Sequence, residues 1–119
     1  MTKRSDENLD TLAVRIAKFS SERDWEQYHT PKNLSMALAV EASELMEIFQ
    51  WLTPEQSSKD GLSPEQIQAA REELADVMIY AIRTSQVLGI DIIDAIAEKL
   101  EKNNAKYPVD KIKGKASLE

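Results

Sequence analysis

Apolar residues recur at helical spacing near the start of the chain, in the i, i+3, i+4, i+7 pattern of an amphipathic helix. We expect this first helix to span about residues 6–21, with Ser5 as its N-cap. The next stretch, residues 23–29, is dense in large polar and aromatic side chains, and we interpret it as a loop with a functional role. The apolar positions of the helix are Leu9, Leu12, Ala13, Ile16 and Phe19.

A second apolar face begins after Thr30-Pro31, where threonine can cap a helix and proline suits its first turn. No Gly or Pro interrupts the residues that follow, so we expect a long helix from about Pro31 to Leu52. Thr53-Pro54-Glu55-Gln56 predicts a short helical turn, and residues 57–61 predict a polar connector. The apolar face consists of Leu34, Leu38, Leu45, Ile48, Phe49 and Leu52.

Two further helices have clear start and stop signals. Ser63-Pro64-Glu65-Gln66 is a capping box with Pro at the first helical position, and Gly89 is a typical residue just past a helix end. A third helix should therefore run from this box to about Leu88. Asp91 can cap a fourth helix through about Lys106, which Tyr107-Pro108 then ends. We expect the basic tail, residues 109–119, to be irregular or docked on a partner.

Length and composition narrow the class of protein. With 119 residues we expect a single domain, 1–119, with its core at about residues 6–108, and three Gly and four Pro favour an all-α fold. A net charge of −6 argues against a nucleic-acid polymer as partner. No apolar run approaches the roughly 20 residues of a membrane span. The lack of cysteine fits a cytoplasmic location.

Two carboxylate pairs, Glu41 with Glu44 and Glu73 with Asp76, stand at i, i+3 spacing on the second and third expected helices. Residues three apart are neighbours on a helix surface, and hard divalent cations prefer carboxylate oxygens from more than one element. At roughly 100° per residue, Glu41 falls inside the apolar face of its helix, Glu44 at the edge, and Glu47 further towards solvent. A carboxylate in an apolar face normally shifts its pKa, pairs, or binds a metal.

The third expected helix is apolar on two sides. Its main stripe leaves Glu73 and Asp76 outside, whereas Ala69, Val77 and Tyr80 flank Glu73. We expect such a helix to pack within its own bundle and also against something else, such as a second protomer. By spacing alone, solvated surface charge stays an alternative for these carboxylates. The main stripe consists of Ile67, Leu74, Met78 and Ala81.

Inward-facing carboxylates in a helical bundle can also form a di-iron site, which uses Glu-x-x-His pairs on two helices. This chain has a single histidine, His29, which precedes the second helix instead of lying within it. The supply of ligands therefore argues against a ferritin-like site.

Residues 40–51 (VEASELMEIFQW) and 71–77 (REELADV) resemble the Glu-x-x-Glu and Glu-x-x-Asp motifs of the MazG-like all-α nucleoside triphosphate pyrophosphohydrolases. Residues 23–29 (RDWEQYH), Asn33-Leu34 and the stretch from Lys99 to Val109 are similar to the dCTP pyrophosphatase branch of that superfamily. The resemblance covers about residues 16–109. Glu-x-x-Glu alone is common, whereas the whole ordered series is specific.

The resemblance implies a four-helix bundle that oligomerises, as a tetramer in this branch, and a Mg²⁺ site. Members of the family cleave a nucleoside triphosphate to the monophosphate and pyrophosphate, with metal neutralising the phosphate oxygens and activating a water. A further carboxylate can orient that water, and Glu47 and Glu72 are candidates by proximity, beside a metal ligand with a second role. The implied Mg²⁺ ligands are Glu41, Glu44, Glu73 and Asp76.

Candidates for phosphate binding lie near the end of the fourth expected helix. Lys99 and Asn103 are one turn apart and share a face, and the resemblance places both near the triphosphate, together with Tyr80 and Tyr107. Lys106 is a further candidate. Lysines at an exposed helix end also interact favourably with the helix dipole, and this alternative stays open.

Aromatic side chains bind bases by stacking, and the two tryptophans, Trp25 and Trp51, flank the second expected helix. Core packing is the alternative for each of them. The resemblance favours a base pocket, with His29 and Phe19 as further wall residues.

We therefore expect a Mg²⁺-dependent pyrophosphohydrolase whose substrate is a small-molecule dNTP, namely dCTP or a modified dCTP analogue. A hydrolase of broad (d)NTP specificity is one alternative. A non-catalytic helical oligomer that binds nucleotides or serves as a scaffold is the other.

Overall fold

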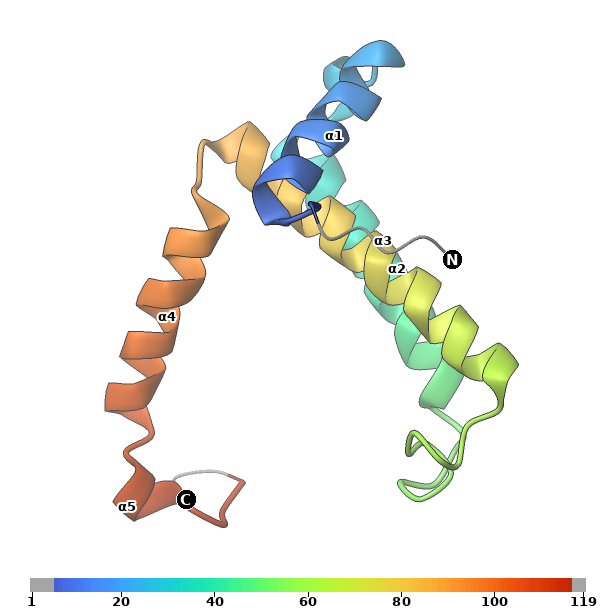
Figure 1. The fold of residues 1–119 in the computed structure, drawn as a ribbon, viewed down its shortest axis with the longest axis vertical. Coiled ribbons are helices and arrows are strands. Elements are labelled where there is room, and N and C mark those ends of the chain that lie inside the picture. Colours follow the sequence, from blue (N-terminus) through green and yellow to red (C-terminus); the bar gives the residue numbers. More distant parts are fainter. Residues whose placement is uncertain (1–5, 117–119) are drawn as a thin grey trace. The chain divides into compact units, whose positions relative to one another are not determined.

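The computed structural model describes residues 6–116, and every regular element in that range is helical (Figure 1). The predicted all-α class is confirmed. No helix in the described range is long and apolar enough to cross a membrane. The elements are α1 (Leu9–Glu22), the 3₁₀ helix η1 (Glu26–Tyr28), α2 (Pro31–Phe49), α3 (Pro64–Leu88), α4 (Ile92–Lys106) and α5 (Val109–Ile112).

The chain divides into two compact units, Met1–Leu88 and Gly89–Glu119, and we describe each by itself. The first holds α1, η1, α2 and α3, and the second holds α4 and α5. A single domain over residues 1–119 and a four-helix bundle therefore stay predictions.

In the first unit, α2 and α3 lie side by side as an antiparallel hairpin, and α1 packs against α3 (Figure 1). The most buried apolar side chains are Leu34, near the start of α2, and Ile82, near the end of α3, which are 1% and 5% exposed. Ser20, near the end of α1, and Ser85 of α3 are also buried. The core of this unit therefore lies where the end of α1, the start of α2 and the end of α3 meet.

Helix α1 begins later than predicted because a better cap lies inside the predicted range. The Asn8 side chain accepts a hydrogen bond from the Thr11 backbone N–H at 3.0 Å, and the Asn8 N–H donates to Thr11 Oγ1 at 2.8 Å. This reciprocal pair satisfies two donors at the start of the helix. The predicted cap, Ser5, lies outside the described residues.

Helix α2 starts as predicted and ends earlier. Thr30 Oγ1 accepts from the Asn33 N–H at 3.1 Å, and Pro31 occupies the first turn. The helix ends at Phe49 instead of Leu52 because Thr53 begins a turn of its own: Gln56 N–H donates to Thr53 Oγ1 at 3.1 Å. A capping residue takes an extended conformation, so the preceding helix cannot continue through it.

The boundaries of α3 and α4 are confirmed. Ser63 and Gln66 form the predicted capping box, with the Gln66 N–H donating to Ser63 Oγ at 3.1 Å. Gly89 adopts φ 68° directly after Leu88, a left-handed conformation that glycine takes without a steric penalty. Asp91 then accepts from the Asp94 N–H at 3.1 Å and starts α4.

Two segments that we expected to be irregular contain short helical turns. Residues 23–29 include η1, in which the Tyr28 N–H donates to the Trp25 carbonyl at 2.8 Å. The basic tail includes α5, which begins directly after Pro108. Such turns are too short to leave a helical period in the sequence. The last part of the predicted tail, residues 117–119, lies outside the described residues.

The two predicted apolar sides of α3 differ in how far this chain covers them. Ile67, Leu74 and Met78 of the main stripe are 41%, 53% and 47% exposed. The half-buried side is the one that carries Glu73 and Val77. On a helix that is apolar on two sides, the count of apolar residues does not decide which side its own chain covers.

Candidate functional site

Three carboxylates from two helices meet on the half-buried side of the hairpin. Glu41 of α2 and Glu73 and Asp76 of α3 each offer an oxygen within 4.8 Å of the others. The i, i+3 spacing puts Glu73 and Asp76 on one side of α3, and the antiparallel pairing of the helices brings Glu41 opposite them. Glu73 Oε2 is buried and has no hydrogen-bond partner. A buried oxygen without a donor, in an all-oxygen set, suits a hard divalent cation.

The neighbouring carboxylates raise the pKa of Glu41. A hydrogen bond with Glu73, burial, and the hydrogen bond and negative charge of Glu44 raise the pKa of Glu41 from 4.5 to about 7. Close like charges disfavour ionisation, so the Glu41 carboxyl holds its proton to a higher pH than an isolated glutamate. A cation would favour release of that proton.

The other acidic candidates lie further out. Glu44 is exposed and helps to raise the pKa of Glu41, but it is not part of the three-carboxylate group. Glu47 and Glu72 are exposed, and Glu72 Oε1 accepts from Gln68 Nε2 at 3.3 Å. Neither Glu47 nor Glu72 is brought into the group, so their predicted role stays a prediction.

A pocket of about 910 Å³ lies beside the carboxylates, lined by α1, α3 and the segment between α1 and α2. Glu41 and Asp76 form part of its wall, so the acidic group and the pocket are continuous. A volume of this size is in the range of small-molecule sites. Four of the predicted substrate-binding residues line it: Phe19, Trp25, His29 and Tyr80.

The aromatic wall is built by a tight reversal after α1. Asp24 takes φ 56°, a left-handed conformation that a short polar side chain tolerates, and Gln27 Nε2 donates to the Asp24 carbonyl at 3.0 Å. The reversal lets the Trp25 N–H donate to the Ser20 carbonyl at 3.0 Å. The Trp25 ring is thereby held over the end of α1.

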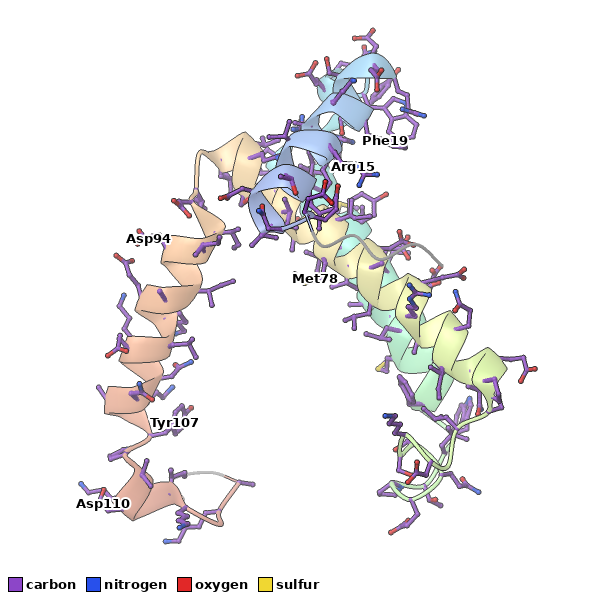
Figure 2. All side chains as sticks on the ribbon, in the orientation of Figure 1. Arg15, Phe19, Met78, Asp94, Tyr107 and Asp110 are labelled. Atoms are coloured by element: carbon purple, nitrogen blue, oxygen red, sulfur yellow. The ribbon has the colours of Figure 1, made fainter. Side chains whose placement is uncertain are left out.

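Three rings follow one another along this wall. Phe19 of α1 and Trp25 pack edge to face with centroids 5.7 Å apart, and Trp25 and His29 do so at 6.4 Å. The Arg23 guanidinium lies 3.7 Å from the centre of the Phe19 ring (Figure 2 shows Phe19 on α1). Such a wall offers apolar surface and one polar ring edge to a flat ligand.

Arg83 also lines the pocket, and the sequence reasoning missed it. It is 8% exposed, and its Nε donates to His29 Nδ1 at 3.0 Å. Burial and the nearby Arg83 charge lower the pKa of His29 from 6.5, while Glu26 acts in the opposite sense. The spacing of Asp76, Tyr80 and Arg83, at i, i+4 and i+7, was a usable signal that the three share a face.

The remaining candidates are Trp51 and four residues of the second unit. Trp51 is 86% exposed and does not line it. Lys99, Asn103, Lys106 and Tyr107 belong to the second unit. Within that unit the Asn103 carbonyl accepts from the Tyr107 N–H at 2.8 Å, and Lys106 Nζ lies 5.3 Å from the Tyr107 ring centre. Their role at a triphosphate stays a prediction.

The site is thus a helical hairpin with three facing carboxylates beside an aromatic-lined pocket, and comparison with known proteins identifies the class to which it belongs. The chain belongs to the MazG-like family, whose model matches residues 36–117. The predicted family resemblance is confirmed.

Individual relatives of known name are similar over most of this chain. dCTP pyrophosphatase 1 of Bos taurus is 38% identical over 112 residues, 94% of this chain and 66% of the relative. The protein of the same name from Homo sapiens is 42% identical over 100 residues, 84% of this chain and 59% of the relative. The chain thus spans between 59% and 66% of the length of these two relatives.

One solved structure is similar over nearly its whole length. A pyrophosphatase from Archaeoglobus fulgidus superposes with a TM-score of 0.78 and 35% sequence identity, covering 91% of this chain and 99% of that one. The similarity therefore extends over most of both chains.

Proposed function

We propose that this chain is a Mg²⁺-dependent nucleoside triphosphate pyrophosphohydrolase that cleaves dCTP or modified dCTP analogues to the monophosphate and pyrophosphate. The observation that carries the proposal is the meeting of Glu41, Glu73 and Asp76 within 4.8 Å at the wall of an aromatic-lined pocket. The names of the relatives, dCTP pyrophosphatase 1 and a pyrophosphatase, support the reaction class.

The three-carboxylate group is the Mg²⁺ site of this proposal. Glu41, Glu73 and Asp76 would hold the ion, with Glu44 beside Glu41 as a further ligand. Bound Mg²⁺ would supply charge neutralisation at the phosphate oxygens and activation of the attacking water. Because the desolvated Glu73 Oε2 lacks a donor, the protein supplies a ligand already freed from solvent.

The pocket would hold the base. Stacking on an aromatic side chain contributes roughly 1–3 kcal/mol per base, and Phe19 and Trp25 offer ring surface while His29 and Tyr80 offer polar edges. For the triphosphate we propose the α4 group, Lys99, Asn103, Lys106 and Tyr107. For orienting the water we propose Glu47 or Glu72, or a metal ligand with a second role.

We also propose that the chain functions as a homotetrameric helical bundle. Large apolar side chains are exposed in each unit taken by itself, including Leu74 of α3 at 53%, and Ile93, Ile96 and Leu100 of α4 at 50%, 48% and 58%. The three α4 residues are spaced i, i+3 and i+7 and share a face. An apolar face of this kind on a small protein marks an interaction surface.

Release of pyrophosphate tests the function. Purified protein is incubated with Mg²⁺ and a panel of dCTP, 5-methyl-dCTP and the other dNTPs and NTPs, and kcat/KM is compared across the panel. We expect the highest values for the cytosine nucleotides and none with a chelator. Equal values across bases would favour the broad-specificity hydrolase. No pyrophosphate from protein that is helical by circular dichroism would overturn the proposal and favour the non-catalytic oligomer.

A further inference from the structure

Arg83 is a buried cation that donates hydrogen bonds to two neutral side chains. It is 8% exposed, its Nε donates to His29 Nδ1 at 3.0 Å, and its Nη1 donates to Gln86 Oε1 at 2.9 Å. No carboxylate within residues 6–116 forms an ion pair with it. A buried charge normally needs a paired opposite charge, because desolvation costs several kcal/mol. A neutral histidine and a neutral amide are therefore unusual partners.

The bond between Arg83 and His29 fixes which ring nitrogen carries hydrogen. A guanidinium has five N–H donors and no acceptor, and it stays charged throughout the working pH range. His29 Nδ1 can therefore only accept in this contact, so the neutral ring must carry its hydrogen on Nε2. A histidine without such a partner can exchange between its two tautomers.

The guanidinium is itself anchored from a second side. Gln86, which accepts from Arg83 Nη1, uses its own Nε2 to donate to the Ala13 carbonyl of α1 at 2.6 Å. A series of hydrogen bonds thus connects His29 to α3 and α3 to α1. The segment that carries His29, α3 and α1 all line the same pocket. Movement of the Arg83 guanidinium away from His29 would break this series of hydrogen bonds.

We propose that Arg83 is a positioning residue that sets base specificity, by holding His29 as a permanent Nε2–H donor in the pocket. The proposal rests on nucleotide hydrolysis at this site. Cytosine has acceptors at N3 and O2, whereas uracil carries an N–H at N3. A histidine free to change tautomer can pair with either edge. A histidine whose hydrogen is fixed on Nε2 pairs with an acceptor and leaves a facing N–H unpaired, which is how a polar site rejects the wrong ligand.

The tautomer can be measured directly, because the chain has one histidine. Imidazole ¹⁵N spectra of the full chain, without nucleotide, should show a protonated Nε2 and an unprotonated Nδ1. Arg83→Gln places a group that can both donate and accept beside Nδ1, so we expect a mixture of tautomers. Arg83→Lys, which can only donate, should retain the single tautomer. Lys59→Gln, at an exposed position in the connector between α2 and α3 that does not line the pocket, is the control and should change nothing.

Selectivity is measured on the same variants as the ratio of kcat/KM for dCTP to that for dUTP. We expect Arg83→Gln to lower the ratio about five- to tenfold, mainly through a higher KM for dCTP, which is the size of one hydrogen bond. Arg83→Lys should restore most of the ratio. If the glutamine variant is unfolded by circular dichroism, Arg83→Met, which removes the donor and adds no acceptor, takes its place.

An unchanged tautomer in the folded glutamine or methionine variant would overturn the proposal, as would an unchanged dCTP to dUTP ratio. If the wild-type protein hydrolyses no nucleotide, the proposed function fails and the specificity role with it. The ¹⁵N spectra would then still decide whether Arg83 fixes the tautomer of His29, so the two failures can be told apart.

Discussion

At the scale of single residues, the acidic site is a case in which helical projection and structure disagree in part. Projection places Glu41 in an apolar face, and the structure has it half-buried in the three-carboxylate group. Projection also favours Glu44 over Glu73 and Asp76, whereas the structure exposes Glu44 and half-buries the other two. The reason is that the burial of α3 is decided by its contact with α2, which no single-helix projection contains.

Replacing Glu41 tests two things separately: its effect on the free energy of unfolding, and its proposed role in metal binding. The folded protein raises the pKa of Glu41 from 4.5 to about 7, so between these values the folded state binds more protons than the unfolded state. The contribution of this group to the free energy of unfolding is therefore present below about pH 4.5 and is lost as the pH rises through about 7. Glu41→Gln should remove that loss.

We expect Glu41→Gln to melt at a higher temperature than the wild type at pH 8 in a chelator, and to show little difference at pH 4.5. Thermal scans at both pH values check this. The same variant should lose Mg²⁺-dependent pyrophosphate release. Glu98→Gln, at an exposed position of α4, is the control and should leave both quantities unchanged. Full turnover in Glu41→Gln would contradict a metal-binding role.

At the scale of elements, helix starts were predictable and some helix ends were not. The predicted caps at Thr30, Ser63 and Asp91 are correct because each cap depends only on a hydrogen bond between residues three apart in the sequence. The start of α1 was misplaced because Asn8 competes with Ser5 as a cap. The end of α2 was misplaced because the next capping box, at Thr53, interrupts a sequence that is otherwise suited to helix.

The connector between α2 and α3 contains a glycine that is required for space. A Cβ on Gly61 would lie 2.5 Å from the Glu55 carbonyl oxygen and 2.8 Å from that of Gln56, both backbone atoms. Gly89 is required for its backbone conformation and not for space. Its φ is 68°, and a Cβ at this position would have no atom within 4 Å. We expect Gly61→Ala to lower the free energy of unfolding by about 1–3 kcal/mol and Gly89→Ala by about 1–2 kcal/mol.

Asparagine distinguishes the two mechanisms. It tolerates the left-handed conformation, so Gly89→Asn should recover part of the stability lost in Gly89→Ala. Gly61→Asn adds more atoms to a crowded place and should be no more stable than Gly61→Ala. Urea unfolding followed by circular dichroism measures all four variants. Equal behaviour of asparagine at both positions would argue against the steric explanation for Gly61.

At the scale of the whole molecule, the sequence predicted an all-α chain and a helix with two apolar sides. What it could not predict is which side the chain covers by itself, because Leu74 and Val77 are equally apolar and only tertiary contact distinguishes them. The pocket was equally hidden. It depends on the turn at Asp24 that returns Trp25 over α1, and on Arg83, which is buried although arginine is seldom a buried residue.

The exposed apolar face of α4 provides the test of assembly. We expect the wild-type chain to have the mass of a tetramer in light scattering coupled to size exclusion, and Ile96→Glu to have a smaller mass, because a charge would be buried without a partner. Ala97→Glu adds the same charge one residue further round the same helix and should leave the mass unchanged. A monomeric wild type that is fully folded would contradict the proposed assembly.

The two tryptophans of the chain stand in very different surroundings. Trp25, 43% exposed, contacts Phe19 and His29 in the pocket wall, whereas Trp51 is 86% exposed beyond the end of α2. Intrinsic fluorescence therefore carries two independent optical signals. Occupation of the pocket by a base would quench the emission of Trp25, and covering of the α2 end by another chain would shift the emission of Trp51 to shorter wavelength. Replacing either residue with phenylalanine leaves a single reporter for binding or for association.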